Sequence, residues 1–276
     1  MLEALKVIIL GIVEGITEWL PISSTGHLIL VEEFIHLELS KEFVEMFNIV
    51  IQFGAILAVI MIYFHKLNPF ARSKTKKQQM LTVQLWVKVA IATIPAMIVG
   101  LLFDDYVDEH FMNAYVVSAM LIIYGILYII VEKRNENKTP AVTKLTQLTI
   151  PMVLAIGGFQ VLAIIPGTSR SGATILGGLL IGASRGVAAE FTFFLAIPVM
   201  FGWSALKMLK FGFAFTAQEF ILLLLGCAVA FGVSVFAIKF LMQYIKNHDF
   251  KVFGYYRIVL GVIVFLYFGI TAVLSM

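Results

Sequence analysis

Two short polar stretches carry the side chains that could do chemistry in an otherwise apolar chain. Residues 14–27 read Glu-Gly-Ile-Thr-Glu-Trp-Leu-Pro-Ile-Ser-Ser-Thr-Gly-His, and residues 160–172 read Gln-Val-Leu-Ala-Ile-Ile-Pro-Gly-Thr-Ser-Arg-Ser-Gly. Each stretch passes through a proline into small hydroxyl residues and a glycine, and then returns to apolar sequence. Ionisable groups at membrane depth are costly and mark candidate functional sites. Two such stretches in matching halves of a chain point to one site at a repeat interface.

The first stretch carries two carboxylates on one helix face. Glu14 and Glu18 are four residues apart, so they are neighbours on a helix. Carboxylates this close repel each other unless a cation lies between them or one is protonated. Oxygen ligands of this kind suit Mg²⁺ or Ca²⁺, with water and a substrate phosphate completing the coordination shell. A solvated helix end is the alternative, but the apolar residues on both sides of the pair disfavour it.

The hydroxyl cluster that follows begins a second helix. Pro21 ends the first helix, and the free N–H groups and dipole of the next helix start favour anions. Ser24 and His27 share a face if that helix begins at residue 23, and a hydroxyl beside an imidazole can act as a nucleophile with its base. Simple N-capping is the alternative for any single hydroxyl. The predicted anion-binding residues here are Ser23, Thr25 and Gly26.

The second stretch centres on Arg170. A guanidinium presents a rigid fork to phosphate oxygens, so this segment predicts an anion-binding cradle. A structural ion pair with Glu14 or Glu18 is the other interpretation, and the two are compatible. The residues expected to complete the cradle are Thr168, Ser169, Ser171 and Gly172, with Gln160 as a supporting polar partner.

The elements that position these residues are membrane helices. The chain is 61% hydrophobic and 13% charged, far from the roughly 25% charged share of soluble domains. This predicts an all-α polytopic membrane protein, and the net charge of +3 gives no reason to expect a nucleic-acid partner. A spanning helix needs about 20 apolar residues. Six segments qualify, at residues 43–64, 80–103, 111–132, 187–206, 216–245 and 252–275.

Residues 4–37 and 145–182 are each broken at the centre by a proline and polar residues. We interpret each as a re-entrant pair of half-helices, although two kinked full spans would be the alternative. Lysines and arginines gather in the loops near residues 66–77, 133–144 and 246–251, which the positive-inside rule places in the cytoplasm. The acidic stretch 104–109 is then expected as an outer loop.

The number of membrane crossings made by each half of the chain predicts two repeats of opposite orientation within one membrane domain, residues 1–276. Repeat one covers 1–132, a linker covers 133–144, and repeat two covers 145–276. The tips of the two re-entrant pairs should meet near the midplane of the membrane. The first pair enters from outside, so the site is expected to open to the outer face.

Both stretches also resemble the signatures of a known family. Residues 14–27 are similar to the glutamate-rich signature of the bacterial undecaprenyl-pyrophosphate phosphatases of the bacitracin-resistance type, and Pro-Gly-Thr-Ser-Arg-Ser-Gly-Ala-Thr at 166–174 resembles their second signature. The resemblance implies a multi-pass enzyme of the bacterial inner membrane. It would remove the terminal phosphate of a polyprenyl diphosphate lipid, recycle the carrier of peptidoglycan synthesis and confer bacitracin resistance.

The family pattern ties Glu14 and Glu18 to metal and catalysis, places Ser24, Thr25 and His27 at the active centre, and makes Arg170 a phosphate ligand. We therefore expect Ser24 to attack the terminal phosphorus while His27 takes its proton. The sequence does not distinguish this mechanism from one in which His27 is the nucleophile or the base that activates water. A transporter or flippase of a polyprenyl phosphate or an anion is the competing hypothesis, because inverted repeats are common in carriers. Membrane lipid is an expected partner, and a homodimer is a further expectation.

Overall fold

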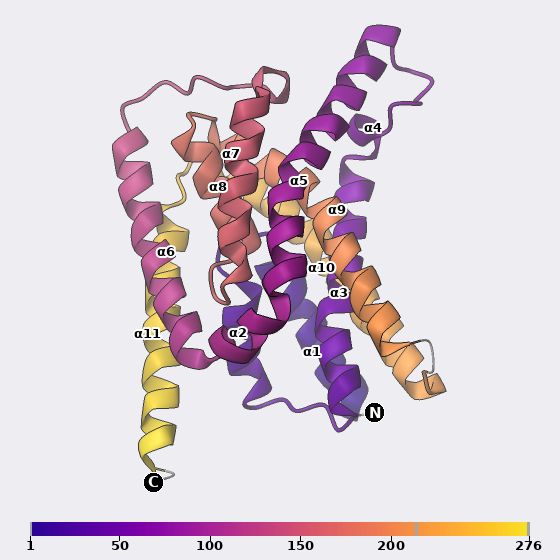
Figure 1. The fold of residues 1–276 in the computed structure, drawn as a ribbon, viewed down its shortest axis with the longest axis vertical. Helices are drawn as coiled ribbons and strands as arrows, with labels where there is room; N and C mark the ends of the chain where they lie inside the picture. The colour runs from indigo at the N-terminus through magenta and orange to yellow at the C-terminus, as the bar shows by residue number, and fades with distance from the viewer. Residues whose placement is uncertain (1, 213–214, 275–276) are drawn as a thin grey trace.

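The computed structural model describes residues 2–212 and 215–274, which form a bundle of α-helices (Figure 1). Within these ranges the only β-type pairing is an isolated bridge between Val142 and Ala183. In chain order the elements are α1 Leu2–Thr17, α2 Ser24–Glu32, α3 Lys41–Ile62, α4 Phe64–Leu67, α5 Lys76–Phe111, α6 Ala114–Asn135, η1 Leu145–Gln147, α7 Ile150–Val161, η2 Leu162–Ile164, α8 Arg170–Leu180, α9 Arg185–Phe211, α10 Ala217–Tyr244 and α11 Lys251–Leu274.

The six predicted spans are confirmed as helices long and apolar enough to cross a membrane: α3, α5, α6, α9, α10 and α11. One boundary differs from the expectation. The acidic stretch 104–109 is not a loop, because α5 continues to Phe111. Residues 101–111 contain no glycine or proline that would end the helix, so it stops only before Asn113, which caps α6.

Both predicted breaks occur between short helices. α1 ends at Thr17 and α2 begins at Ser24, while α7 ends at Val161 and α8 begins at Arg170. The residues between them hold the two polar stretches. We call residues 18–23 the first turn and residues 165–169 the second turn.

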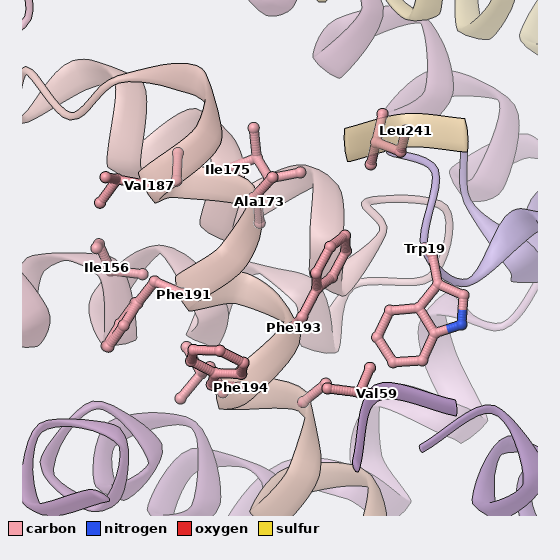
Figure 2. Close-up of a cluster of buried hydrophobic side chains, with 14 of the residues drawn as sticks. Trp19, Val59, Ile156, Ala173, Ile175, Val187, Phe191, Phe193, Phe194 and Leu241 are labelled. Atoms are coloured by element: carbon pink, nitrogen blue, oxygen red, sulfur yellow. The ribbon is translucent and has the colours of Figure 1, made fainter. Parts of the chain in front are cut away.

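The apolar core that supports the turns is built around α9. Trp19 of the first turn packs edge-on against Phe193, with ring centroids 5.4 Å apart (Figure 2). Phe191 and Phe194 are fully buried in the same cluster, together with Ile175 of α8. The first turn is therefore anchored to the second half of the chain by a buried aromatic contact, which fixes its position relative to α8.

Small residues let the long helices approach closely. A Cβ on Gly125 of α6 would lie 2.7 Å from the carbonyl oxygen of Gly254 of α11, and a Cβ on Gly254 would lie 2.7 Å from the oxygen of Gly125. Close approach of this kind is how membrane helices gain van der Waals contact without a hydrophobic driving force. The α6–α11 pair forms one side of the bundle (Figure 1).

The two ends of the bundle carry different parts of the chain. The marked chain termini lie at one end, and the connection between α6 and α7 lies at the other, near α4 (Figure 1). At that end the linker is held to the α8–α9 turn, because the Val142 N–H donates to the Gly182 oxygen and the Ser184 N–H donates to the Val142 oxygen. An ion pair between the buried Glu132 and the partly buried Arg185, 2.6 Å between Oε2 and Nη2, lies beside it.

Candidate active site

The first turn ends in a strained serine cap. Ser23 has φ of 73°, a conformation that costs a non-glycine residue energy, and its Oγ accepts the Gly26 N–H at 3.2 Å. This satisfies one of the free N–H groups at the start of α2. The cap leaves Ser24 as the first residue of the helix, with its side chain directed back toward α1.

The second turn ends in the same way. Ser169 has φ of 71°, and its Oγ accepts the Gly172 N–H at 3.1 Å. Gly167, with φ of 88°, passes so close to α6 that a Cβ would lie 2.5 Å from the Val117 oxygen, so only glycine fits. Arg170 is thus the counterpart of Ser24, since each follows a serine cap with φ near 70°.

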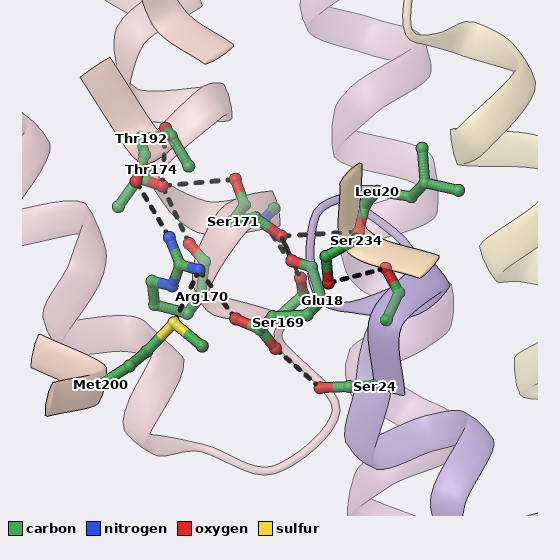
Figure 3. Close-up of polar contacts among 12 residues, drawn as sticks. Glu18, Leu20, Ser24, Ser169, Arg170, Ser171, Thr174, Thr192, Met200 and Ser234 are labelled. Atoms are coloured by element: carbon green, nitrogen blue, oxygen red, sulfur yellow. Dashed lines mark hydrogen bonds and ion pairs between the residues drawn. The ribbon is translucent and has the colours of Figure 1, made fainter. Parts of the chain in front are cut away.

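Glu18 joins the two turns. Its Oε1 accepts Arg170 Nη2 at 2.7 Å, and its Oε2 accepts the Ser24 hydroxyl at 3.1 Å (Figure 3). Arg170 also donates to the Thr192 carbonyl oxygen at 2.9 Å, and its guanidinium lies 5.7 Å from the Trp19 ring centre. The predicted ion pair between the stretches is therefore present, and it brings a hydroxyl, a carboxylate and a guanidinium together.

A cavity of about 270 Å³ opens beside this junction. Its wall also carries apolar groups and the amine-bearing Lys207 of α9. The predicted site residues that line it are Glu18, Ser24, Thr25, Gln160, Ser169 and Arg170. A polar junction at the end of a largely apolar cavity suits an amphipathic ligand with an anionic group.

The other predicted anion-binding residues are buried behind this wall. Ser171 is 1% exposed, and its hydroxyl donates to the Glu18 carbonyl oxygen at 2.9 Å and contacts Ser169 Oγ at 3.2 Å. It therefore ties the turns together and has no free face toward the cavity. The residues that do not line the cavity are Glu14, Ser23, Gly26, His27, Thr168, Ser171 and Gly172.

Glu14 fits the chemistry of a cation ligand. It is fully buried, neither carboxylate oxygen has a hydrogen-bond partner, and it lies within electrostatic range of Glu18 and Arg170. The side-chain amide of Gln160 is unpartnered as well. Among the described residues no group of three or more histidine, cysteine, aspartate or glutamate side chains converges on one point. Glu14 and Glu18 could thus supply two ligands to Mg²⁺, which commonly takes only one or two carboxylates.

The predicted Ser24–His27 hydrogen bond is not formed. His27 Nδ1 contacts the Ser23 carbonyl oxygen at 2.6 Å, and Nε2 contacts the Tyr256 hydroxyl at 2.8 Å. Because a carbonyl can only accept, Nδ1 carries a proton, and a neutral ring would accept the Tyr256 proton at Nε2. Although Ser24 and His27 are three residues apart on one helix, the strained Ser23 carbonyl and α11 draw the imidazole away. The hydroxyl of Ser24 is paired with Glu18 instead.

Comparison with known proteins identifies the family of the chain. The family model described as bacitracin resistance protein BacA matches residues 7–263, which include both turns. This chain belongs to the BacA family. A relative from Acetivibrio thermocellus is 62% identical over 271 residues, 97% of this chain and 98% of its own length. Relatives from Enterococcus faecalis and Desulfitobacterium hafniense are 62% and 59% identical, over 95% and 100% of this chain and 96% and 99% of their own lengths. All three are named undecaprenyl-diphosphatase.

The structure of this BacA-family chain adds residues that sequence reasoning missed. Arg257 of α11 is fully buried and donates to carbonyl oxygens of both turns. Tyr128 of α6 donates to the Gly172 oxygen at 2.8 Å, and Tyr256 holds His27. The rule that singled out Glu14, a charge inside an apolar span, would have singled out Arg257 too. No comparable sequence signal marks the two tyrosines, since tyrosine is common in membrane helices.

Proposed function

We propose that this protein removes the terminal phosphate of undecaprenyl diphosphate and releases undecaprenyl phosphate. The observation that carries the proposal is the junction of Glu18, Ser24 and Arg170 at one cavity wall, in a chain about 60% identical to proteins named undecaprenyl-diphosphatase. The product is the lipid carrier of peptidoglycan synthesis. Bacitracin sequesters undecaprenyl diphosphate. More enzyme leaves less of this lipid for the drug to bind, and the cell becomes resistant.

Arg170 and the start of α8 hold the phosphate in this proposal. The guanidinium is paired with Glu18, and the arriving phosphate takes over that pairing. The N–H groups at the first positions of α8 and α2 are not used by the helices, so they can donate to the same anion. Thr25, which lines the cavity, adds a hydroxyl donor, whereas the hydroxyl of Ser169 is already paired with Ser171 and the Gly172 N–H.

Ser24 is the nucleophile that the contacts favour. Its Oγ forms a bond to the terminal phosphorus, the bridging P–O bond breaks, and undecaprenyl phosphate leaves. The Ser24 proton passes to Glu18 Oε2, which already accepts it in a hydrogen bond. Water then hydrolyses the phosphoserine and releases phosphate. Glu18 replaces His27 as the proton acceptor here, because His27 is paired with Ser23 and Tyr256.

A divalent cation is part of the proposal, held by Glu14 and Glu18 as the sequence predicts. The unpartnered oxygens of Glu14 support this assignment. Mg²⁺ or Ca²⁺ would neutralise charge on the diphosphate oxygens. Glu14→Gln should lower turnover by about 100-fold or more, the scale seen when a metal or oxyanion contact is lost. Excess EDTA should inactivate the wild type, and added Mg²⁺ or Ca²⁺ should restore it. Full activity in EDTA would contradict the metal role.

The inner bacterial membrane with an outward-facing site is the proposed location. α4 lies at the same end as the linker, away from the chain termini (Figure 1), and the segment from α4 to the start of α5 contains Lys66, Arg72 and Lys74. The positive-inside rule makes that end cytoplasmic. The cavity wall includes Met112, just after α5, and Lys207, near the end of α9, so it extends toward the opposite, outer end.

Two inverted repeats with re-entrant tips are the proposed architecture, and the packing supports them. Helices at equivalent positions of the two repeats pack on each other: α3 on α9, and α6 on α11. The contact of α1 with α10 likewise has an equivalent in the contact of α7 with α5. Glycines twelve residues before each serine cap mark equivalent contacts: a Cβ on Gly11 would lie 3.0 Å from the Gly226 oxygen of α10, and one on Gly157 would lie 2.4 Å from the Ala92 oxygen of α5. The division at residues 133–144 and a homodimer stay predictions.

This packing also favours the second candidate function, transport of a polyprenyl phosphate or an anion. Alternating-access carriers commonly have inverted repeats around a midplane site. A carrier, however, has no need of a hydroxyl hydrogen-bonded to a carboxylate beside an arginine. Phosphate release separates the two functions, because transport leaves the phosphoanhydride bond intact.

The test is release of inorganic phosphate from undecaprenyl diphosphate by purified protein in detergent with Mg²⁺. We expect one phosphate and one undecaprenyl phosphate for each substrate consumed, and about a thousandfold or greater loss in Glu18→Gln. No release above a protein-free control, or release that Glu18→Gln leaves unchanged, would contradict the proposal.

A further inference from the structure

Arg257 connects the two turns from outside the cavity. Its Nη1 donates to the Pro21 oxygen of the first turn at 3.2 Å. Its Nη2 donates to the second turn, at 2.8 Å from the Gly167 oxygen and 2.9 Å from the Thr168 oxygen. One guanidinium of α11 therefore sets the spacing between the two turns, and with it the spacing of Ser24 and Arg170, the residues that follow them.

The charge on this side chain calls for an explanation. Arg257 is fully buried, and among the described residues it forms no ion pair with a carboxylate. Its neighbours are carbonyl oxygens and the face of Tyr124, whose ring centre lies 5.5 Å away. Burying a charge is expensive when no opposite charge compensates it. A neutral donor could have bridged carbonyl groups at lower cost, so a positive charge here suits a site that receives an anion.

The contacts also orient backbone donors. In a trans peptide the C=O and the following N–H point in opposite directions. The Thr168 carbonyl points at Arg257, so the Ser169 N–H of the same peptide points away from it. Ser169 lines the cavity and precedes the first residue of α8, whose own hydrogen bonds do not use this N–H. The hydrogen bond from Arg257 to the Thr168 oxygen thus keeps the Ser169 N–H on the side away from Arg257, where it is available to a phosphate in the cavity.

The same contacts hold Ser169 in its strained conformation. With φ of 71°, Ser169 needs its surroundings to keep it there. The hydrogen bond from Arg257 to Thr168 acts on one side of this residue, and the cap from Ser169 Oγ to Gly172 acts on the other. Loss of the first would let the turn relax and rotate the N–H away from the cavity.

We propose that Arg257 is a positioning residue for phosphoryl transfer. It fixes the two turns relative to each other and directs the amide groups at the start of α8 to the transferring phosphate, without touching the substrate. This inference rests on the proposed function, because it concerns the phosphate site of that reaction. Donors of this kind act mainly on the transition state, so they affect kcat more than KM.

The test compares Arg257→Lys and Arg257→Gln with the wild type in phosphate release from undecaprenyl diphosphate, with folded protein measured by size-exclusion chromatography and thermal unfolding. Lysine keeps the charge but loses the fork, and glutamine keeps an amide donor but loses the charge. We expect kcat per folded molecule to fall at least about thirtyfold in each, while KM changes less than about threefold. Arg185→Lys is the matched control, because Arg185 is a partly buried arginine paired with Glu132 and lies away from the cavity.

A kcat per folded molecule within twofold of the wild type would overturn the positioning role, whatever happens to the unfolding temperature. If neither variant folds, Gly172→Ala perturbs the same contacts more gently, since its Cβ would lie 3.1 Å from both Arg257 Nη1 and Ser169 Cβ, so that these groups must shift by a few tenths of an ångström; unchanged kcat would again overturn the role. An inactive wild type would overturn the proposed function and this inference together. An active wild type with equally active variants would overturn this inference alone.

Discussion

The two turns share one backbone solution and carry opposite charges. Each begins after a short apolar helix, contains a proline and ends in a serine cap with φ near 70° whose Oγ accepts a glycine N–H three residues later. After the cap the first turn presents the hydroxyl of Ser24, and the second presents the guanidinium of Arg170. Glu18 binds both. The same backbone geometry thus begins two helices with different side chains, and in the proposed mechanism Ser24 is the nucleophile while Arg170 binds the phosphate.

Turnover should therefore fall most when the Ser24 hydroxyl, which follows the first turn, is removed. Ser24→Ala removes the proposed nucleophile and should lower kcat by about a thousandfold or more, as loss of a nucleophile does in other enzymes. The matched control is Ser40→Ala, which removes a cap hydroxyl at the start of α3, outside the cavity wall. The readout is steady-state phosphate release by purified protein. Retention of more than a tenth of the activity by Ser24→Ala would assign the attack to water or His27.

The second turn should depend on the shape of its cation. Arg170→Lys keeps the positive charge and can still pair with Glu18, but it loses the fork that holds two phosphate oxygens. We expect kcat/KM to fall at least about tenfold, roughly 1.4 kcal/mol of transition-state stabilisation. Thermal unfolding in the same detergent should be nearly unchanged. A loss of activity that only parallels a loss of folded protein would make Arg170 structural, and near wild-type turnover would refute the bidentate contact.

The contact that holds His27 should have the smallest effect. Tyr256→Phe removes one hydrogen bond to the imidazole, whose net value is about 1 kcal/mol, so turnover should fall roughly fivefold or less. Tyr255→Phe is the control, because Tyr255 is an exposed tyrosine next to Tyr256 on α11, whereas the hydrogen bond to His27 comes from Tyr256. A thousandfold loss in Tyr256→Phe alone would place His27 in the chemistry and return the proton-acceptor role to it.

Much of the fold followed from the sequence, because lipid imposes simple rules on helix length and apolarity. The six spans and the two breaks were predicted near their observed positions. The continuation of α5 through its acidic end was missed, since charge suggested a loop where no residue breaks the helix. Orientation in the membrane and the inverted repeats stay predictions.

At the site, spacing along the chain predicted that Arg170 could pair with Glu14 or Glu18, but it did not predict the hydrogen bond between Ser24 and Glu18. It failed for His27, because residues three apart on a helix can be drawn to different partners, here Ser23 and Tyr256. Arg257 was missed although its charge in an apolar span was visible. Its contacts to backbone carbonyls could not be predicted, since they depend on how α11 packs against both turns.

The central claim is that the two turns form one phosphoryl-transfer centre, and a double-mutant cycle in kcat/KM between Ser24→Ala and Arg170→Lys tests it most directly. Residues that act on the same transition state are not additive. We predict that the double variant is no more than about threefold worse than Ser24→Ala alone, because the contact of Arg170 is of little use once the nucleophile is gone. Losses that multiply in full would contradict the account, since they would mean that the two turns act independently.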